Sequence, residues 1–171
     1  MVPADMLIGK EGEGMKMIMT NFNHERFVIA IQAVRSCRLC YSEAVHEALT
    51  RRTFGKKLIE HQIIRFKLAE MARQIEALQA LIEHIAFQFS KGVADKDLGA
   101  QCALLKVQAS KTFEYCAREA VQIFGGSGLV KEGRGIIVER LYRDVREKAI
   151  PGGSEEILLD LAIRETMKGK L

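Results

Sequence analysis

Residues 64–89, IRFKLAEMARQIEALQALIEHIAFQF, decide the fold of this chain. Apolar side chains recur along this stretch at alternating steps of four and three residues, which is the spacing of one face of an α-helix. We predict a helix of about 28 residues, roughly 40 Å long at 1.5 Å per residue, that ends at Gly92. The positions of the apolar face are Ile64, Leu68, Met71, Ile75, Leu78, Ile82, Ile85 and Phe89.

A second helix is predicted on the N-terminal side of this stretch. It begins near Asn21 or Asn23, because the side-chain oxygen of either residue can cap a helix N-terminus. Residues 1–19 have little core of their own, and they suggest the end of a strand followed by a Gly-rich connector. The apolar face of the helix is Ala30, Val34, Cys37, Tyr41, Val45 and Ala48.

Three more helices are predicted on the C-terminal side. A long one begins at Asp95 or Asp97, and its seam of small residues would let a neighbouring helix approach closely. The sequence GGSG at 125–128 stops it. A shorter helix covers about residues 137–148, and a last one starts from an N-cap at Ser154. No strand pattern follows residue 20. The predicted fold is all-α, an antiparallel up-down bundle of three long and two shorter helices.

The composition narrows the class of protein. Of the 171 residues, 48% are hydrophobic and 28% are charged, which suits one folded domain with a core. The net charge is +4, but basic and acidic residues are interleaved, so we expect a small anionic ligand and not nucleic acid. We find neither a signal-peptide pattern nor a long apolar run, so no membrane span is expected. The expected location is intracellular, with the mitochondrial matrix, peroxisome and cytoplasm left open.

Cysteine spacing raises the possibility of metal or redox chemistry. Cys37 and Cys40 have CxxC spacing, but they fall inside a helical pattern, and the four histidines are scattered along the chain. We therefore expect these two residues, with Cys102 and Cys116, to be buried core residues in a reducing compartment. No metal site is predicted.

The connector at residues 51–62, RRTFGKKLIEHQ, contains more functional groups than a linker requires. Gly55 allows a sharp turn between the two helical patterns. Cationic, hydroxyl, aromatic and amide groups all lie within this short segment. We expect the connector to contact a ligand.

Four short motifs resemble those of the acyl-CoA dehydrogenases in order and approximate spacing. They are RRTFGK at 51–56, QIFGGSG at 122–128, RD at 143–144 and GSEEI at 153–157. The resemblance covers essentially the whole chain. It implies that residues 20–171 form the family's C-terminal helical bundle domain, and that residues 1–19 are a remnant of the middle β-domain and its connector. The family's N-terminal helical domain and most of its β-domain have no counterpart in the chain.

The resemblance also implies an activity, the FAD-dependent α,β-dehydrogenation of an acyl-CoA thioester to a trans-2-enoyl-CoA. In that reaction a carboxylate removes the α-proton while the β-hydrogen leaves as a hydride to the flavin. The implied assembly is a homodimer or homotetramer in which a second subunit completes each flavin site. The implied electron acceptor is electron-transfer flavoprotein.

Binding residues follow from the motifs by the same resemblance. The connector and the 122–126 turn match contacts to the FAD, in part the FAD of a neighbouring subunit, and the start of the last helix matches an adenine-side contact. The substrate side is implied to involve Asn23, His24, Arg26 and Gly153. The implied cofactor residues are Arg51, Arg52, Thr53, Phe54, His61, Gln62, Gln122, Ile123, Phe124, Gly125, Gly126, Ser154, Glu155 and Glu156.

The catalytic base has two alternative positions in the family. Many members have a glutamate just before the last helix, but that position is Gly152 here. A minority, the isovaleryl-CoA and long-chain enzymes, use a glutamate directly before an arginine in the first long helix, and this chain has Glu25 before Arg26. The resemblance therefore implies Glu25 as the base. The alternative is that Glu25 only stabilises the helix dipole from the first turn.

The chain departs from the family pattern in three places. The chain is about three residues longer than the pattern between Gly128 and Val138, and Pro151 replaces a commonly aromatic residue, so the acyl-chain length is in doubt. Glu156 also stands where a neutral amide is common.

Two other functions remain open. The domain could act as a stand-alone, catalytically inactive oligomerisation module without flavin. It could also be a cofactor-free bundle unrelated to the family.

Overall fold

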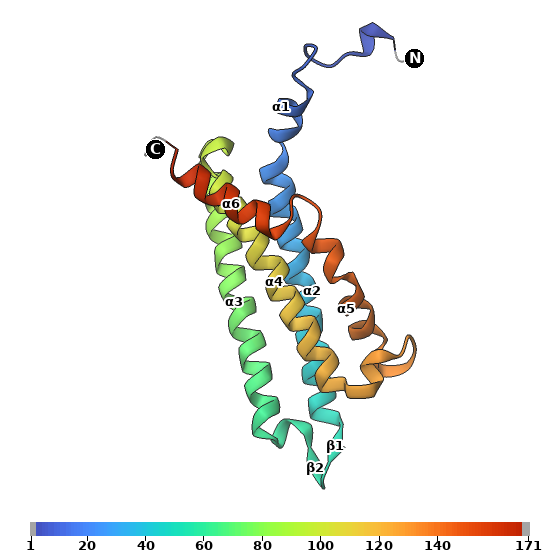
Figure 1. Cartoon of the computed structure of the whole chain (residues 1–171). Coiled ribbons are helices and arrows are strands. Elements are labelled where there is room, and N and C mark those ends of the chain that lie inside the picture. Colours follow the sequence, from blue (N-terminus) through green and yellow to red (C-terminus); the bar gives the residue numbers. More distant parts are fainter. Residues whose placement is uncertain (1–2, 169–171) are drawn as a thin grey trace.

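The computed structural model describes residues 3–168, which form a bundle of helices (Figure 1). Three long helices run alongside one another in alternating directions: α2 (Phe22–Thr50), α3 (Gln62–Ser90) and α4 (Gly99–Phe124). Helix α5 (Ile136–Ala149) lies beside α2 and α4, and α6 (Glu155–Thr166) crosses one end of the bundle. The predicted all-α bundle of three long and two shorter helices is confirmed.

Helix α4 is the centre of the bundle, because it packs against α2, α3, α5 and α6. Its contact with α2 is the most extensive between any two helices of the described chain. Small side chains fill both sides of this contact, as the small-residue seam of α4 predicted. All four cysteines are buried and unpaired within this core. The small buried residues are Ala30, Ala33, Cys37, Cys40, Ala44 and Ala48 on α2, and Cys102, Ala109, Cys116, Ala117 and Ala120 on α4.

The periodic stretch at residues 64–89 lies within α3 and packs as predicted. Its six inner positions are buried, and the two end positions, Ile64 and Phe89, are partly buried against the same core. The backbone leaves the helix at Gly92, whose φ of +76° is readily adopted only by glycine. The period of apolar residues therefore predicted both the length and the inward face of this helix.

A short hairpin at the α2–α3 connection was not predicted. Strands β1 (Arg52–Thr53) and β2 (Lys56–Lys57) pair antiparallel, with Arg52 opposite Lys57 and Thr53 opposite Lys56. Two-residue strands are too short to show an alternating pattern, so the sequence revealed only the turn. A 3-10 segment, Leu58–Glu60, leads from the hairpin into α3.

The N-terminal segment differs from the prediction. It contains a 3-10 turn at Ala4–Met6 and a short helix, α1 (Gly14–Met19), and residues 3–19 as described contain no strand. This segment projects away from the bundle, beyond the start of α2 (Figure 1). The glycine-rich composition concealed α1, whose remaining residues are apolar or basic helix formers.

The predicted asparagine and aspartate caps are also wrong. Asn21 is at the N-cap position of α2, but its side chain makes no capping bond and its amide donates to Glu25 Oε1 at 3.2 Å. Asn23 lies within α2 and donates to the main-chain oxygen of Asp95 at 2.8 Å. Residues 95–97 form a 3-10 turn and α4 begins only at Gly99. A tertiary contact between α2 and this turn therefore uses the side chains of Asn23 and Asp95, which the sequence assigned to capping.

Two further segments connect α4 to α5. They are the 3-10 turns Gly125–Leu129 and Gly133–Gly135, which contact each other at the hairpin end of the bundle. The described helices include no stretch long and apolar enough to cross a membrane. The described residues also contain no cluster of three or more His, Cys, Asp or Glu residues suited to a metal ion.

Candidate functional site

The predicted base, Glu25, lies in the first turn of α2 with its side chain exposed. It lines an open pocket of about 440 Å³ between α2 and the α5–α6 connector at residues 150–154. Gly152 of this connector lines the same pocket. The two alternative base positions of the family thus face one space, and only Glu25 offers a carboxylate to it. The lining residues are Asn21, His24, Glu25, Val28, Ile29, Pro151 and Gly152.

Arg26 fixes the connector from the α2 side. Its side chain is buried, and its Nε atom donates to the main-chain oxygen of Gly152 at 3.0 Å while Nη1 donates to Asn23 Oδ1 at 3.3 Å. The guanidinium also lies 5.4 Å from the ring centre of Phe22. Burial lowers the pKa of Arg26, and the nearby Glu25 carboxylate works against that lowering. Arg26 therefore holds a wall of the pocket in place.

Lys106 fixes the same connector from α4, and sequence reasoning missed it. The lysine is completely buried, and its Nζ atom donates to the main-chain oxygens of Ala149 and Gly153, the latter at 2.8 Å. Burial lowers the pKa of the ammonium group. The available signal was its position four residues after Cys102 and three before Ala109, beside the predicted inward seam of α4.

Backbone conformation explains the two glycines of the connector. Gly152 has a φ of +72° and Gly153 a φ of +115°, a region that residues with a Cβ atom rarely adopt. A Cβ atom on Gly152 would also lie 3.1 Å from Ile29 Cδ1. A residue with a Cβ atom at this position would therefore strain the connector as the structure has it.

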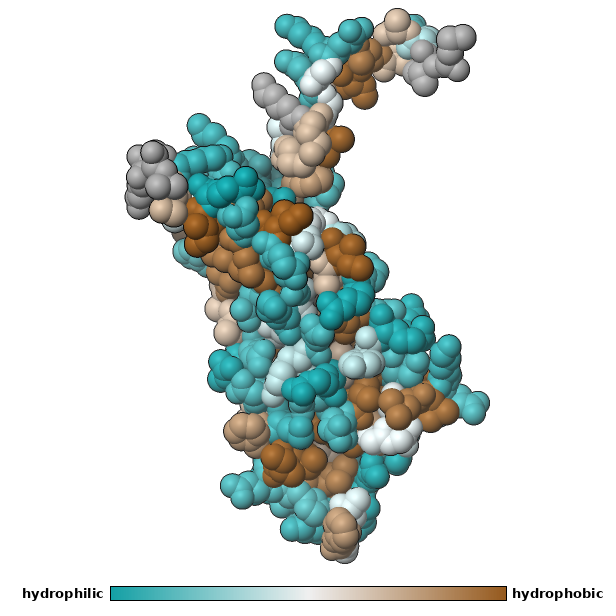
Figure 2. All heavy atoms as spheres, in the orientation of Figure 1, coloured by the Kyte–Doolittle hydropathy of each residue, from teal (hydrophilic) through white to brown (hydrophobic). Residues whose placement is uncertain are grey.

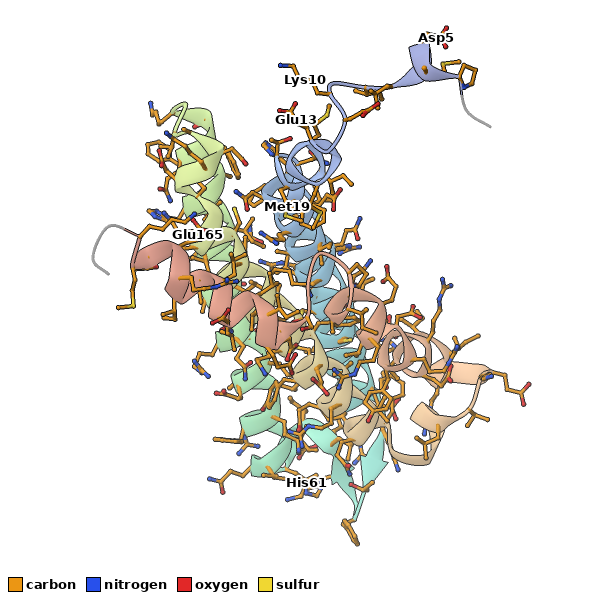
Figure 3. The ribbon with its side chains drawn as sticks, turned by 45° about the horizontal axis from the view of Figure 1, so that its top comes forward. Asp5, Lys10, Glu13, Met19, His61 and Glu165 are labelled. Atoms are coloured by element: carbon orange, nitrogen blue, oxygen red, sulfur yellow. The ribbon has the colours of Figure 1, made fainter. Side chains whose placement is uncertain are left out.

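The other predicted substrate-side residues of α2 are engaged in packing. His24 Nδ1 lies 3.3 Å from Asp95 Oδ1, and its ring is tilted against Phe89 with the centroids 4.9 Å apart. Asn23 is buried and bonded to Asp95, but it also lines a second pocket of about 530 Å³. Met19 and Glu165 line that second pocket as well, at the α6 end of the bundle (Figure 3).

The predicted cofactor residues of the connector lie at the opposite end, where Figure 3 labels His61. Thr53 Oγ1 lies 3.1 Å from His61 Nε2, which ties the hairpin to the start of α3. Phe54 is at the hairpin tip, where its φ is +50° and its side chain is 97% exposed. Its ring meets the His61 ring edge-on at 6.4 Å. An aromatic ring so exposed is available to pack against a partner or a ligand. Arg52 and Gln62 are exposed beside it.

Arg51 joins this hairpin to the predicted 122–126 turn. Its Nη1 atom donates to the main-chain oxygen of Phe124 at 2.9 Å, so two motifs that are distant in sequence are in contact. Gln122 and Gly126 are exposed there. The side chains of Ile123 and Phe124 are buried in the core, so only the main chain of these two residues can contact a ligand. Gly125 ends α4 with a φ of +63° and lies close to Arg51.

The start of α6 holds the third set of predicted cofactor residues. Ser154 Oγ accepts from the main-chain nitrogen of Ile157 at 3.5 Å, which confirms it as the N-cap. Glu155 is bonded to α4 through Ser110 Oγ at 2.7 Å and Lys111 Nζ at 3.0 Å. Burial works against ionisation of Glu155, but these two donors outweigh it, so its pKa is lowered. Glu156 is exposed.

These residues form two separate clusters. Glu25 and Arg51 lie near opposite ends of α2, about 39 Å apart at 1.5 Å per residue. The base-side cluster comprises Glu25, Arg26 and the 152–156 segment, whereas the hairpin-side cluster comprises residues 51–54, 61–62 and 122–126. A single copy of the chain therefore cannot bring both clusters to one reacting atom.

Comparisons with known proteins identify the family of the chain. The family model described as "Acyl-CoA dehydrogenase, C-terminal domain" matches residues 12–167. The chain belongs to the acyl-CoA dehydrogenase family. The alternative of a helical bundle unrelated to this family is thereby contradicted.

Individual acyl-CoA dehydrogenases support the assignment. Acyl-CoA dehydrogenase apdG of Emericella nidulans is 43% identical over 170 residues, which are 98% of this chain and 39% of that protein. A probable acyl-CoA dehydrogenase from Mycobacterium abscessus superposes with a TM-score of 0.89 at 38% identity, covering 96% of this chain and 42% of that one.

A third match is a chain in the solved structure of the electron-transferring flavoprotein of Acidaminococcus fermentans. It is 30% identical with a TM-score of 0.86, and the match covers 98% of this chain and 42% of that one. The chain thus spans about two fifths of the length of these relatives, and within them it corresponds to the C-terminal helical domain.

Proposed function

We propose that this chain is the FAD-contacting and oligomerisation domain of an acyl-CoA dehydrogenase that converts an acyl-CoA thioester to a trans-2-enoyl-CoA. The observation that carries the proposal is the pocket between α2 and the α5–α6 connector. Both family positions for the base line it, and Glu25 alone supplies a carboxylate. Membership of the family, together with this pocket, supports the reaction class.

In this proposal Glu25 is the general base. Its exposed carboxylate accepts the α-proton of the acyl thioester at one of its Oε atoms, and it needs no rearrangement of the α2 backbone to reach the pocket. Arg26 and Lys106 hold the facing wall through main-chain oxygens, so the distance across the pocket is fixed by two buried side chains. The flavin, when bound, supplies the hydride acceptor for the β-hydrogen.

The residues present suit a flavin dinucleotide held by more than one subunit. Arg51 has a third of its side chain exposed beside the glycine turn, and nothing lies within 4 Å of a Cβ atom placed on Gly126, so an anionic group can approach closely. At the other end, α6 begins at Glu155 after its N-cap Ser154, and a helix N-terminus favours an anionic group. Because these clusters are far apart, each would serve a different flavin. That arrangement requires a homodimer or homotetramer.

The proposed substrate is an acyl-CoA and the proposed electron acceptor is electron-transfer flavoprotein. The names of the dehydrogenase relatives support the substrate class, and the match to a chain in the electron-transferring flavoprotein structure of Acidaminococcus fermentans supports the acceptor. Asn23, His24 and Gly153 then line or support the substrate side, although their described contacts are mostly structural.

A second candidate is an inactive oligomerisation module without flavin. The observation that favours it is the set of large apolar side chains exposed on the helices, including Phe66, Phe87 and Ile163. The apolar patches visible on the bundle surface would then serve assembly alone (Figure 2).

The visible absorbance spectrum separates the two candidates. We expect the purified chain, after incubation with FAD and gel filtration, to keep a flavin spectrum in its oligomeric fraction. Protein that remains colourless after added FAD would contradict the flavin-contacting role. The inactive oligomerisation module would then be the remaining candidate.

A further inference from the structure

We propose that Arg134 is a second guanidinium ligand for the diphosphate group of the bound dinucleotide, beside Arg51. The inference rests on the proposed function in one respect, namely that the hairpin-side cluster, which contains Arg51, binds the cofactor. Arg134 belongs to the stretch between Gly128 and Val138. None of the four motifs includes it.

A buried carboxylate brings the two arginines together. Glu47, on the last turn but one of α2, is 3% exposed, and its Oε1 atom has no hydrogen-bond partner among the described residues. Two guanidinium groups approach that same oxygen: Arg134 Nη2 at 3.5 Å and Arg51 Nη1 at 3.8 Å. The carboxylate is therefore a counter-ion shared by two cations. These three groups together carry one net positive charge.

Close packing of the 133–135 turn fixes where Arg134 lies. A Cβ atom on Gly135 would lie 1.9 Å from the main-chain oxygen of Ser127, so only glycine allows the turn to pack this closely. Arg134 then donates from Nε and Nη2 to Ser127 Oγ, at 3.2 and 3.1 Å. The turn thus places its guanidinium over the glycine-rich end of α4.

Both guanidinium groups keep donors for a ligand. The side chains of Arg51 and Arg134 are 33% and 54% exposed. Arg51 uses Nη1 for Phe124, and Arg134 uses Nε and Nη2 for Ser127, which leaves other N–H groups of each without a protein partner among the described residues. Two neighbouring guanidinium groups with one spare positive charge suit an anion that has oxygens on two phosphorus atoms, because arginine binds phosphate oxygens in a charge-assisted, often bidentate way.

The test is a calorimetric titration of the full chain with inorganic pyrophosphate and ADP, and with adenosine as the uncharged comparison. Arg134→Gln should weaken pyrophosphate and ADP binding about tenfold, as expected for loss of one charge-assisted hydrogen bond, and leave adenosine unchanged. Arg134→Lys, which keeps the charge but loses the planar fork, should give a smaller loss. Arg164→Gln is the matched control, because Arg164 is a similarly exposed arginine paired with Asp160 on α6.

The outcomes separate this inference from the proposed function. If Arg51→Gln weakens binding while Arg134→Gln matches the control, the inference is wrong and the cofactor role of Arg51 stands. If neither variant changes binding, or the unaltered chain binds neither anion, both are wrong. An equal loss for adenosine would also overturn the inference, since the effect would not concern phosphate. FAD and coenzyme A both contain a diphosphate, and the proposal requires the Arg134→Gln loss to appear with FAD.

Discussion

The Nζ atom of Lys106 donates a hydrogen bond to the main-chain oxygen of Gly153 at 2.8 Å, from a side chain that is completely buried. The same ammonium group also bonds the Ala149 oxygen at the end of α5. With Arg26 bonded to Gly152, three carbonyls of the α5–α6 connection are held by two buried cations. Arg26 and Lys106 together fix the wall of the pocket that faces Glu25.

Replacing Lys106 with methionine should lower the free energy of unfolding by about 1–3 kcal/mol. The variant keeps the length of the side chain but leaves the Ala149 and Gly153 oxygens without their buried donor, and an unpaired buried polar group costs about that much. Urea denaturation followed by circular dichroism measures the change. Lys10→Met, at an exposed position, should stay within about 0.5 kcal/mol of the unaltered protein. Equal effects of the two variants would contradict the role of Lys106.

The stability contribution of Lys106 should depend on pH in a defined direction. Burial lowers its pKa below the ordinary 10.5, so above the folded-state pKa the unfolded chain binds the extra proton and the folded chain does not. Stability relative to Lys106→Met should therefore rise as the pH increases through the folded-state pKa toward 10.5. Paired denaturation curves from pH 7 to pH 10 measure this difference. A difference that does not rise over this range would contradict the lowered pKa of Lys106.

Gly152→Ala should destabilise the chain by about 1–2 kcal/mol. The φ of +72° disfavours any residue with a Cβ atom, and the new methyl group would approach Ile29. Gly126→Ala is the matched control, because its backbone has no positive φ and its surroundings are open. Thermal denaturation of both variants tests the comparison. If Gly152→Ala is no worse than Gly126→Ala, backbone strain does not exclude a side chain at position 152.

The chain should form a dimer or tetramer in solution. Several large apolar side chains are exposed on helices that already belong to the bundle, including Phe66 at 64%, Phe87 at 58% and Ile163 at 60%. Exposed apolar surface of this kind favours association, and the surface view shows it in patches separated by polar side chains (Figure 2). Sedimentation velocity over a range of protein concentrations measures the state. A monomer throughout that range would contradict the expectation.

Much of the fold could be predicted because helical periodicity is a local property. The alternating apolar spacing from Ile64 to Phe89 defined α3, and the N-cap at Ser154 was correctly predicted because it depends on neighbouring main-chain groups. The predicted cap at Asn23 failed for the opposite reason. Asn23 is used by Asp95, 72 residues away, and no local pattern reveals such a contact.

For the candidate site, the sequence offered only residues that the resemblance to the family marks. Glu25 and Arg51 followed from family motifs, and the structure places them near opposite ends of α2. Lys106, Glu47 and Arg134 belong to no motif, and their roles depend on helices that meet in space. A lysine or glutamate on a helix is usually exposed, so burial of Lys106 and Glu47 became evident only from the packed bundle.

The most direct test of the account is the rate of flavin reduction by an acyl-CoA in the flavin-loaded enzyme that contains this domain. Stopped-flow absorbance under anaerobic conditions compares the unaltered enzyme with Glu25→Gln, which keeps the size of the side chain but cannot take the α-proton. We predict a rate lower by a factor on the order of 10²–10⁴, with little change in acyl-CoA affinity. An unchanged rate of flavin reduction would contradict the assignment of Glu25 as the base.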